Sequence, residues 1–256
     1  MDTFLYAIIF IIGCFFGSFF TLAVYRIPRK EDILIKHSYC PNCNHKLGFF
    51  DLFPVLSYIF LGGKCKYCSN KIRPRYLILE LLSGFTFLML AISSKMHILS
   101  VNSIIASVFL LLYVSILFIV CGIDKENILI EKKVLLFGFI IELIYIIYQY
   151  TLGIVDVYQY VMYLILFIIL LIISIISIKV SLKEEYFIQN LYLSLYMIIF
   201  GGSTIYILTV ILTLLIITIY MLLSKQKLKT LPIGFYLSVS NILVIIISNM
   251  IINYMI

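Results

Sequence analysis

Long runs of apolar residues, separated by short polar segments, are the dominant pattern along the chain. The runs lie at about 4–25, 77–94, 101–122, 134–151, 158–178, 186–200, 203–223 and 233–255. A membrane-spanning helix needs roughly 20 apolar residues, and most of these runs have that length. They do not alternate apolar and polar positions, as the strands of a membrane barrel do. The pattern therefore predicts an all-α polytopic membrane protein with about eight transmembrane helices.

The two runs at 186–200 and 203–223 are separated only by Gly201 and Gly202. A Gly-Gly pair is a turn signal, which favours two helices. One broken helix is the alternative.

The composition excludes an ordinary soluble domain. Hydrophobic residues make up 64% of the 256 positions and charged residues 12%, whereas soluble domains are about one quarter charged and about half apolar. The apolar runs extend over most of the length, so a signal peptide does not account for them. Most of the chain is therefore expected to have membrane lipid as its solvent.

The basic residues predict how the chain is oriented. Ten of the 19 Lys and Arg residues lie between the first two helices, at 26–76, and such residues favour the cytoplasmic side. With that loop inside and the N-terminus outside, the clusters at 125–133, 179–183 and 225–229 also fall inside, and only Lys95 falls outside. The net charge of +7 then reflects topology, and we expect no nucleic-acid partner. The predicted parts are a first helix at 1–25, a cytoplasmic domain at 26–76 and a helical core at 77–256.

The cytoplasmic domain contains a candidate metal site. Cys40 and Cys43 form one CxxC pair, Cys65 and Cys68 form another, and 21 residues separate the pairs. This spacing is typical of four-cysteine zinc sites, in which each pair supplies two thiolates of a tetrahedron. Two disulfides are the alternative, but cytoplasmic thiols stay reduced. We therefore expect structural zinc.

Several motifs resemble the type IV prepilin peptidase family of bifunctional leader peptidase/N-methyltransferases. The matching segments begin with GSFF at 17–20 and VYRIP at 24–28. They continue with DLFPVLSY at 51–58, RPRY at 73–76 and LELLSG at 79–84. Further along, IDKE at 123–126 and LPIGF at 231–235 are similar to the family's later motifs.

The resemblance implies a bacterial plasma-membrane enzyme that cleaves the leader of type IV pilin-like precursors at the cytoplasmic face. The family is similar to the GxGD aspartic proteases, in which two acids activate one water. Asp124 matches the position of the first acid. The second is missing, since no Asp follows a GxG motif.

Three interpretations of the missing acid remain open. Glu184 or Glu185, about 60 residues after Asp124, stands where the second aspartate is expected and replaces it. Alternatively, the peptidase is inactive while another role survives. In the third interpretation a different acid serves, and Glu142 within a membrane helix is the candidate, because acids there are functional by default.

The second family activity is N-methylation of the new N-terminus with S-adenosylmethionine. The resemblance assigns it to the loop region, including Gly17, Glu80 and the four cysteines, and these residues are present. The sequence thus predicts a prepilin-processing protein. The alternative is a peptidase-inactive relative that acts as a methyltransferase or as a pilin-binding scaffold.

Overall fold

The chain is helical throughout the part that the structure describes. The structure is a computed structural model covering residues 2–33, 37–95, 100–153, 157–176, 182–224 and 231–255. Within these ranges two isolated β-bridges accompany the helices, and no longer strand occurs. The chain forms two compact units, Met1–Ile104 and Ile105–Ile256. The all-helical prediction is confirmed.

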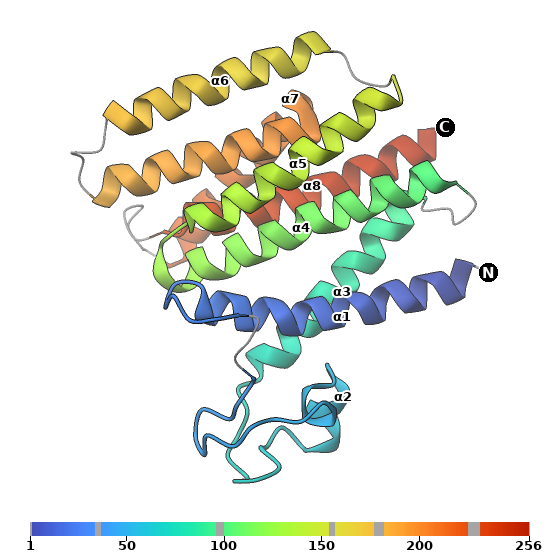
Figure 1. Cartoon of the computed structure of the whole chain (residues 1–256), viewed down its shortest axis with the longest axis vertical. Helices are drawn as coiled ribbons and strands as arrows, with labels where there is room; N and C mark the ends of the chain where they lie inside the picture. Colours follow the sequence, from blue (N-terminus) through green and yellow to red (C-terminus); the bar gives the residue numbers. More distant parts are fainter. Residues whose placement is uncertain are drawn as a thin grey trace. The chain divides into compact units, whose positions relative to one another are not determined.

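Unit 1 contains two long helices and the cysteine-containing segment between them (Figure 1). Helix α1 (Asp2–Arg26) packs against α3 (Arg75–Ser93). Pro28 follows the end of α1, and Pro74 is the N-cap of α3, which are positions where proline limits a helix without disrupting it. The intervening segment contains the short helices η1 (Phe50–Leu52) and α2 (Leu56–Phe60).

The close packing of α1 on α3 depends on glycine. A Cβ atom built on Gly13 would lie 2.8 Å from the Cα of Gly84, and one built on Gly84 would lie 2.6 Å from the Sγ of Cys14. Helices in membranes associate through such small residues, because they let the backbones approach and make van der Waals contact. The α1–α3 contact is therefore an interface of small residues. It holds in position the residues at the end of the two helices.

Unit 2 is a bundle whose central helix is α7. The helices are α4 (Val101–Asn127), α5 (Lys132–Thr151), α6 (Val157–Ile176), α7 (Leu182–Ser224) and α8 (Ile233–Met255). Helix α7 packs against α5, α6 and α8. The aromatic ring of Tyr113 on α4 stacks on that of Tyr196 on α7, with ring centroids 4.9 Å apart. Helix α4 extends past the predicted end at 122, so Asp124 lies within its last turns.

Helix α7 is broken at Gly202, and Figure 1 shows that α7 changes direction along its length. Gly202 has φ 77° and ψ 171°, a conformation open only to glycine. The apolar stretch Glu185–Ser224 is 40 residues long, or about 60 Å as a straight helix, twice the bilayer core. The break turns this length into two segments, as the Gly-Gly pair predicted.

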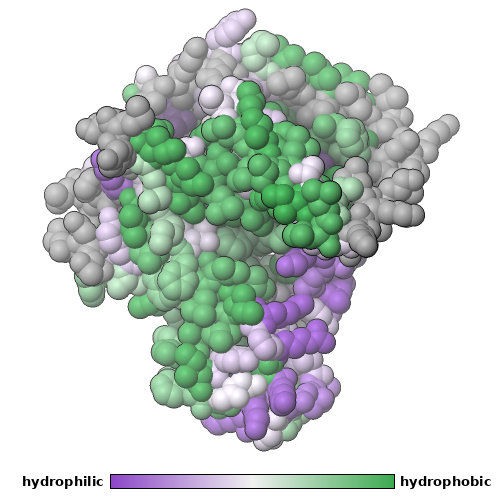
Figure 2. Space-filling view, turned by 180° about the vertical axis from the view of Figure 1, so that it is seen from behind, coloured by the Kyte–Doolittle hydropathy of each residue, from purple (hydrophilic) through white to green (hydrophobic). Residues whose placement is uncertain are grey.

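The helices suit a membrane. Six helical segments in the described ranges are long and apolar enough to cross one, counting Glu185–Ser224 once; α6 is a further 20-residue helix of apolar sequence. Figure 2 shows a broad hydrophobic surface over the helices, with hydrophilic residues gathered on one side of the lower end, where the cysteine-containing segment lies. The protein is therefore a multi-pass membrane protein.

Candidate functional site

The four cysteines of the two CxxC pairs come together in unit 1. The Sγ atoms of Cys40, Cys43, Cys65 and Cys68 all lie within 4.8 Å of one another, and none of them forms a disulfide. Tetrahedral zinc with Zn–S bonds of about 2.3 Å places its sulfurs roughly 3.8 Å apart, and the Cys40 and Cys68 sulfurs are 3.9 Å apart. The residues therefore fit a tetrahedral metal ion, and the disulfide alternative does not describe this structure.

Each cysteine pair lies in a turn of the same form. The backbone N–H of Asn44 donates to the Cys40 carbonyl, and the N–H of Ser69 donates to the Cys65 carbonyl. Asn44 and Ser69 both have positive φ, 54° and 57°. The Asn70 backbone N–H lowers the pKa of the Cys68 thiol to about 7, which favours the thiolate that binds metal. The short spacing of each CxxC thus creates a turn whose N–H groups point at sulfur.

Asp51 connects the segment between the two cysteine pairs to the Cys65–Cys68 pair through hydrogen bonds. Its Oδ2 accepts hydrogen bonds from the Gly48 N–H at 3.0 Å and from the Tyr67 hydroxyl at 2.9 Å. The Gly48 N–H, and then the Tyr67 hydroxyl, hold the pKa of this carboxyl below its usual value. The ring of His45 stacks on Tyr67 at 3.6 Å, so His45 is a packing residue of the loop.

Gly17 and Glu80 meet where α1 crosses α3. A Cβ atom on Gly17 would lie 2.7 Å from the Glu80 Cα and 3.0 Å from the Leu79 carbonyl oxygen. Only a glycine permits this approach. The Glu80 side chain is nine-tenths buried, and its Oε2 accepts a hydrogen bond from the Val55 N–H at 2.8 Å. Val55 has φ 63°, which is unusual for a β-branched residue, so the loop is held in a costly conformation at the Glu80 carboxylate.

A cavity of about 540 Å³ lies beside Glu80, between the long helices of unit 1 and the cysteine segment. Cys40 and Cys65 line it from the metal side, and Glu80 and Arg26 line it from the helices. The Arg26 side chain is buried and donates to the carbonyl oxygens of Asp32 and His37. The volume is in the usual range for small-molecule and cofactor sites. A buried carboxylate and a buried guanidinium in one cavity suit a zwitterionic ligand.

Asp124 is the buried acid of unit 2. Its side chain is 0% exposed, and its Oδ2 accepts hydrogen bonds from the Phe235 N–H at 2.8 Å and the Tyr186 hydroxyl at 3.0 Å. The Tyr186 hydroxyl accepts in turn from the Ile233 N–H at 2.8 Å. A Cβ atom on Gly234 would lie 3.1 Å from the Asp124 Oδ2, so glycine allows the first turn of α8 to hold the carboxylate. Helix N-termini are ready-made sites for an anion.

One of the two carboxylate oxygens of Asp124 takes no part in the hydrogen bonds described above. Its Oδ1 is buried and has no hydrogen-bond partner among the described residues. Such an atom can accept a hydrogen bond from a water or a substrate. A dyad of the aspartic-protease kind needs a second acid sharing that water.

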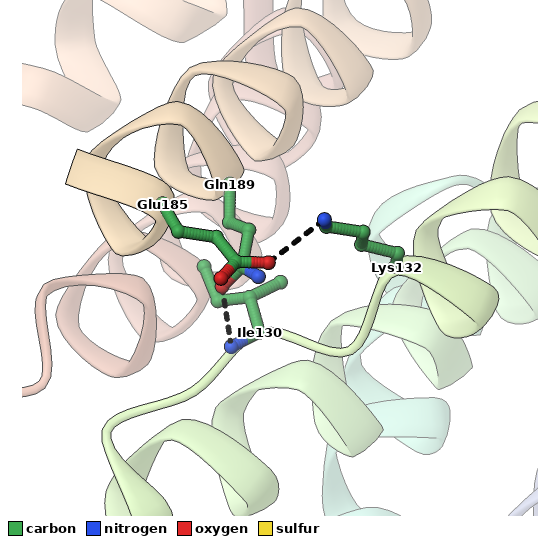
Figure 3. A network of polar contacts seen from close by, with 4 residues as sticks. All are labelled: Ile130, Lys132, Glu185 and Gln189. Atoms are coloured by element: carbon green, nitrogen blue, oxygen red, sulfur yellow. Dashed lines mark hydrogen bonds and ion pairs between the residues drawn. The ribbon is translucent and has the colours of Figure 1, made fainter. Parts of the chain in front are cut away.

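The residues expected to supply the second acid lie elsewhere or are not described. The Glu185 carboxylate forms an ion pair with Lys132 at 2.8 Å (Figure 3). The Lys132 side chain is exposed and that of Glu185 is about half exposed. In the same figure Gln189 accepts a hydrogen bond from the Ile130 N–H. The side chain of Glu184 is outside the described part of the chain. Replacement of the second aspartate by Glu184 or Glu185 therefore stays a prediction.

Tyr186 and Gly13 are the site residues that sequence reasoning missed. Tyr186 immediately follows Glu185, and its hydroxyl donates to Asp124. Gly13 and Gly17 are four residues apart, and this GxxxG spacing in an apolar helix is the signal that could have predicted the α1–α3 interface.

Comparisons with known proteins agree with this arrangement. Residues 11–94 match the sequence model of the bacterial peptidase A24 N-terminal domain. The prepilin leader peptidase/N-methyltransferase of Vibrio cholerae is 40% identical over 87 residues, which is 30% of this chain and 34% of the relative. The protein of that name from Bacillus subtilis is 32% identical over 131 residues, 51% of this chain and 50% of the relative. The one from Myxococcus xanthus is 36% identical over 79 residues, 31% of this chain and 24% of the relative.

The matched segments thus span between a quarter and half of these relatives. No solved structure matches the chain. Residues 11–94, which the family model matches, lie in unit 1 and include the four cysteines, Gly17 and Glu80. Over the matched residues this chain is similar to the bacterial peptidase A24 N-terminal domain and to prepilin leader peptidase/N-methyltransferases.

Proposed function

We propose that the protein N-methylates the amino terminus of type IV pilin-like proteins in the Glu80 cavity, at the cytoplasmic face of the bacterial plasma membrane. The observation that carries this proposal is the 540 Å³ cavity itself, with Glu80 and Arg26 in its wall and the cysteine cluster beside it. The proposal places the cysteine segment inside and the N-terminus outside, because that arrangement puts 18 of 19 basic residues in the cytoplasm.

The proposed cofactors fit the residues that would hold them. Cys40, Cys43, Cys65 and Cys68 would bind a structural zinc ion, which would stabilise a segment with few buried apolar side chains. S-adenosylmethionine, which supplies a methyl group when bound, carries an α-carboxylate and an α-amino group. In the cavity Arg26 would face the carboxylate, since arginine recognises carboxylates bidentately.

Glu80 would hold the amine that is methylated. A carboxylate within hydrogen-bond reach orients an ammonium group and accepts its proton, which exposes the nitrogen lone pair for attack. The N–H of Val55 donates to the Oε2 of Glu80, and the Ser18 side chain is a further hydrogen-bond partner of the carboxylate. The substrate amine would share one carboxylate oxygen with these donors. Gly17 would keep α1 close enough to α3 that this oxygen faces the cavity.

Leader cleavage at Asp124 is the second candidate function. The unpartnered Oδ1 of Asp124 favours it, since that atom is available to a water. The hydroxyl of Tyr186, which lies on the other oxygen, is a weak acid and differs from the carboxyl of an aspartic dyad. Cleavage would therefore need Glu184 or Glu185 to approach Asp124 when a substrate is bound.

One experiment separates the two functions. Purified protein in detergent is given a pilin-like precursor and, separately, the same protein with its leader already removed. We expect methyl transfer from labelled S-adenosylmethionine to the mature substrate, lost in Glu80→Gln and kept in Asp124→Asn. Cleavage of the precursor that disappears in Asp124→Asn and in Glu184→Gln or Glu185→Gln would establish the peptidase as well. Protein that binds zinc and yet transfers no methyl group would refute the first function.

A further inference from the structure

Glu142 is a second buried acid, and the site described above does not use it. It lies on α5 with 3% of its side chain exposed, and neither carboxylate oxygen has a hydrogen-bond partner among the described residues. An ionised carboxylate in an apolar interior is very costly unless something compensates its charge. Acids inside membrane helices usually face a cavity and take part in function.

A cavity of about 100 Å³ lies at Glu142, within unit 2. One face of α5 contributes Glu142, Tyr145 and Gln149; α6 contributes Tyr160, and α7 contributes Phe200. A single water occupies about 10–15 Å³ of such volume. The space is therefore larger than one water or one bare ion requires.

Three aromatic side chains, Tyr145, Tyr160 and Phe200, line this cavity. Phe200 stacks on Tyr113 with ring centroids 3.9 Å apart and on Tyr145 at 5.7 Å. Tyr196 also stacks on Tyr113, with ring centroids 4.9 Å apart. The buried hydroxyl of Tyr196 has no hydrogen-bond partner among the described residues. Aromatic faces attract cations within about 6 Å, and aromatic cages recognise alkylated ammonium groups.

Glu142 is the one acidic side chain among the described residues of the lining. The hydroxyl of Tyr160 donates to the Gln149 Oε1 at 3.3 Å, so these two polar groups partly satisfy each other. The lining residues that the structure describes include no Lys or Arg. A positive charge in this cavity has to come from a ligand.

From this geometry we propose that the Glu142 cavity binds a small organic ammonium ion. The Glu142 carboxylate would pair with the charge, and Tyr145 and Phe200 would enclose the alkyl part. The isoleucine side chains and aromatic rings of the lining suit the alkyl part of such an ion, whereas a bare alkali ion prefers a complete shell of oxygen ligands. The site is separate from Asp124, which contacts α7 and α8 through Tyr186 and Phe235.

The test measures the melting temperature of the full-length protein in lipid nanodiscs at pH 8. Methylammonium, tetramethylammonium, sodium and potassium chlorides are compared at constant ionic strength. A ligand at about 100 times its Kd should raise the melting temperature of a protein this size by roughly 5 °C. We expect this rise with an ammonium salt and not with sodium or potassium.

Two variants decide whether the effect arises at this cavity. Glu142→Gln should abolish the ammonium response, and the matched variant Glu126→Gln, at an exposed acid of α4, should keep it. Phe200→Leu, which keeps an apolar side chain but removes the ring, should weaken the response and decides the matter if Glu142→Gln does not fold. An equal rise with sodium, no rise with any ammonium salt, or an unchanged response in Glu142→Gln and Phe200→Leu would overturn the proposal.

Discussion

Replacing Gly17 with alanine should separate α1 from α3 at Glu80 and impair the reaction proposed there. The new Cβ atom would lie 2.7 Å from the Glu80 Cα, whereas carbon atoms in good contact are about 3.5–4.0 Å apart. The Glu80 Cα and the Leu79 carbonyl oxygen, 3.0 Å from the same position, are backbone atoms that cannot rotate away. The helices must therefore move apart locally by roughly 1 Å.

The expected effects on stability and on activity differ in size. Overpacking costs about 1–3 kcal/mol, and the better helix propensity of alanine offsets up to about 1 kcal/mol of that. A displacement of 1 Å at a reacting group costs on the order of 100-fold in rate. Gly17→Ala should thus remain folded while methyl transfer falls by about two orders of magnitude.

Gly13→Ala is the matched control for this prediction. Its Cβ atom would lie 2.8 Å from the Gly84 Cα and 2.9 Å from the Phe87 Cβ, so it forces a similar separation one turn away from Glu80. Both variants are assayed by thermal unfolding in detergent and by transfer of a labelled methyl group to a mature pilin-like substrate. Equal losses of activity in both variants, or near-normal activity in Gly17→Ala, would refute the argued role of Gly17.

Three further predictions concern the metal site, the Asp124 clamp and the exposed ion pair. Cys68→Ser should lower the bound metal per chain, measured by elemental analysis, and make the cysteine segment sensitive to protease, because the metal supplies much of its folding energy. Tyr186→Phe removes the hydroxyl that bridges α4 and α8 and should lower the free energy of unfolding by about 1–3 kcal/mol, while Tyr150→Phe at an exposed position should leave it unchanged. Glu185→Gln breaks an exposed pair with Lys132 and should change stability by less than about 1 kcal/mol, so a complete loss of cleavage in this variant would mark Glu185 as a catalytic acid.

The sequence by itself determined the helices and the metal-site residues. Runs of about 20 apolar residues leave a chain in lipid no other way to satisfy its backbone than to form helices, and the observed helices coincide with those runs. The CxxC spacing determines a local turn that presents two sulfurs, so the Cys40–Cys43 and Cys65–Cys68 pairs were predictable from short-range geometry. Gly202 likewise marked the break in α7 because its conformation is a local property.

The tertiary structure alone decided which side chains meet across the bundle. Asp124 contacts Tyr186 and the first turn of α8, 62 and 111 residues further along, and the registers of three helices determine that meeting. One residue of register on a helix is about 100° of rotation, which sends Glu185 to Lys132 and Tyr186 to Asp124. The cavities at Glu80 and Glu142 arise in the same way, since each is lined by residues far apart in sequence. The apolar pattern of the sequence predicts that a helix is buried. It does not predict which residue of a neighbouring helix each side chain contacts, because side-chain packing between the helices determines those contacts.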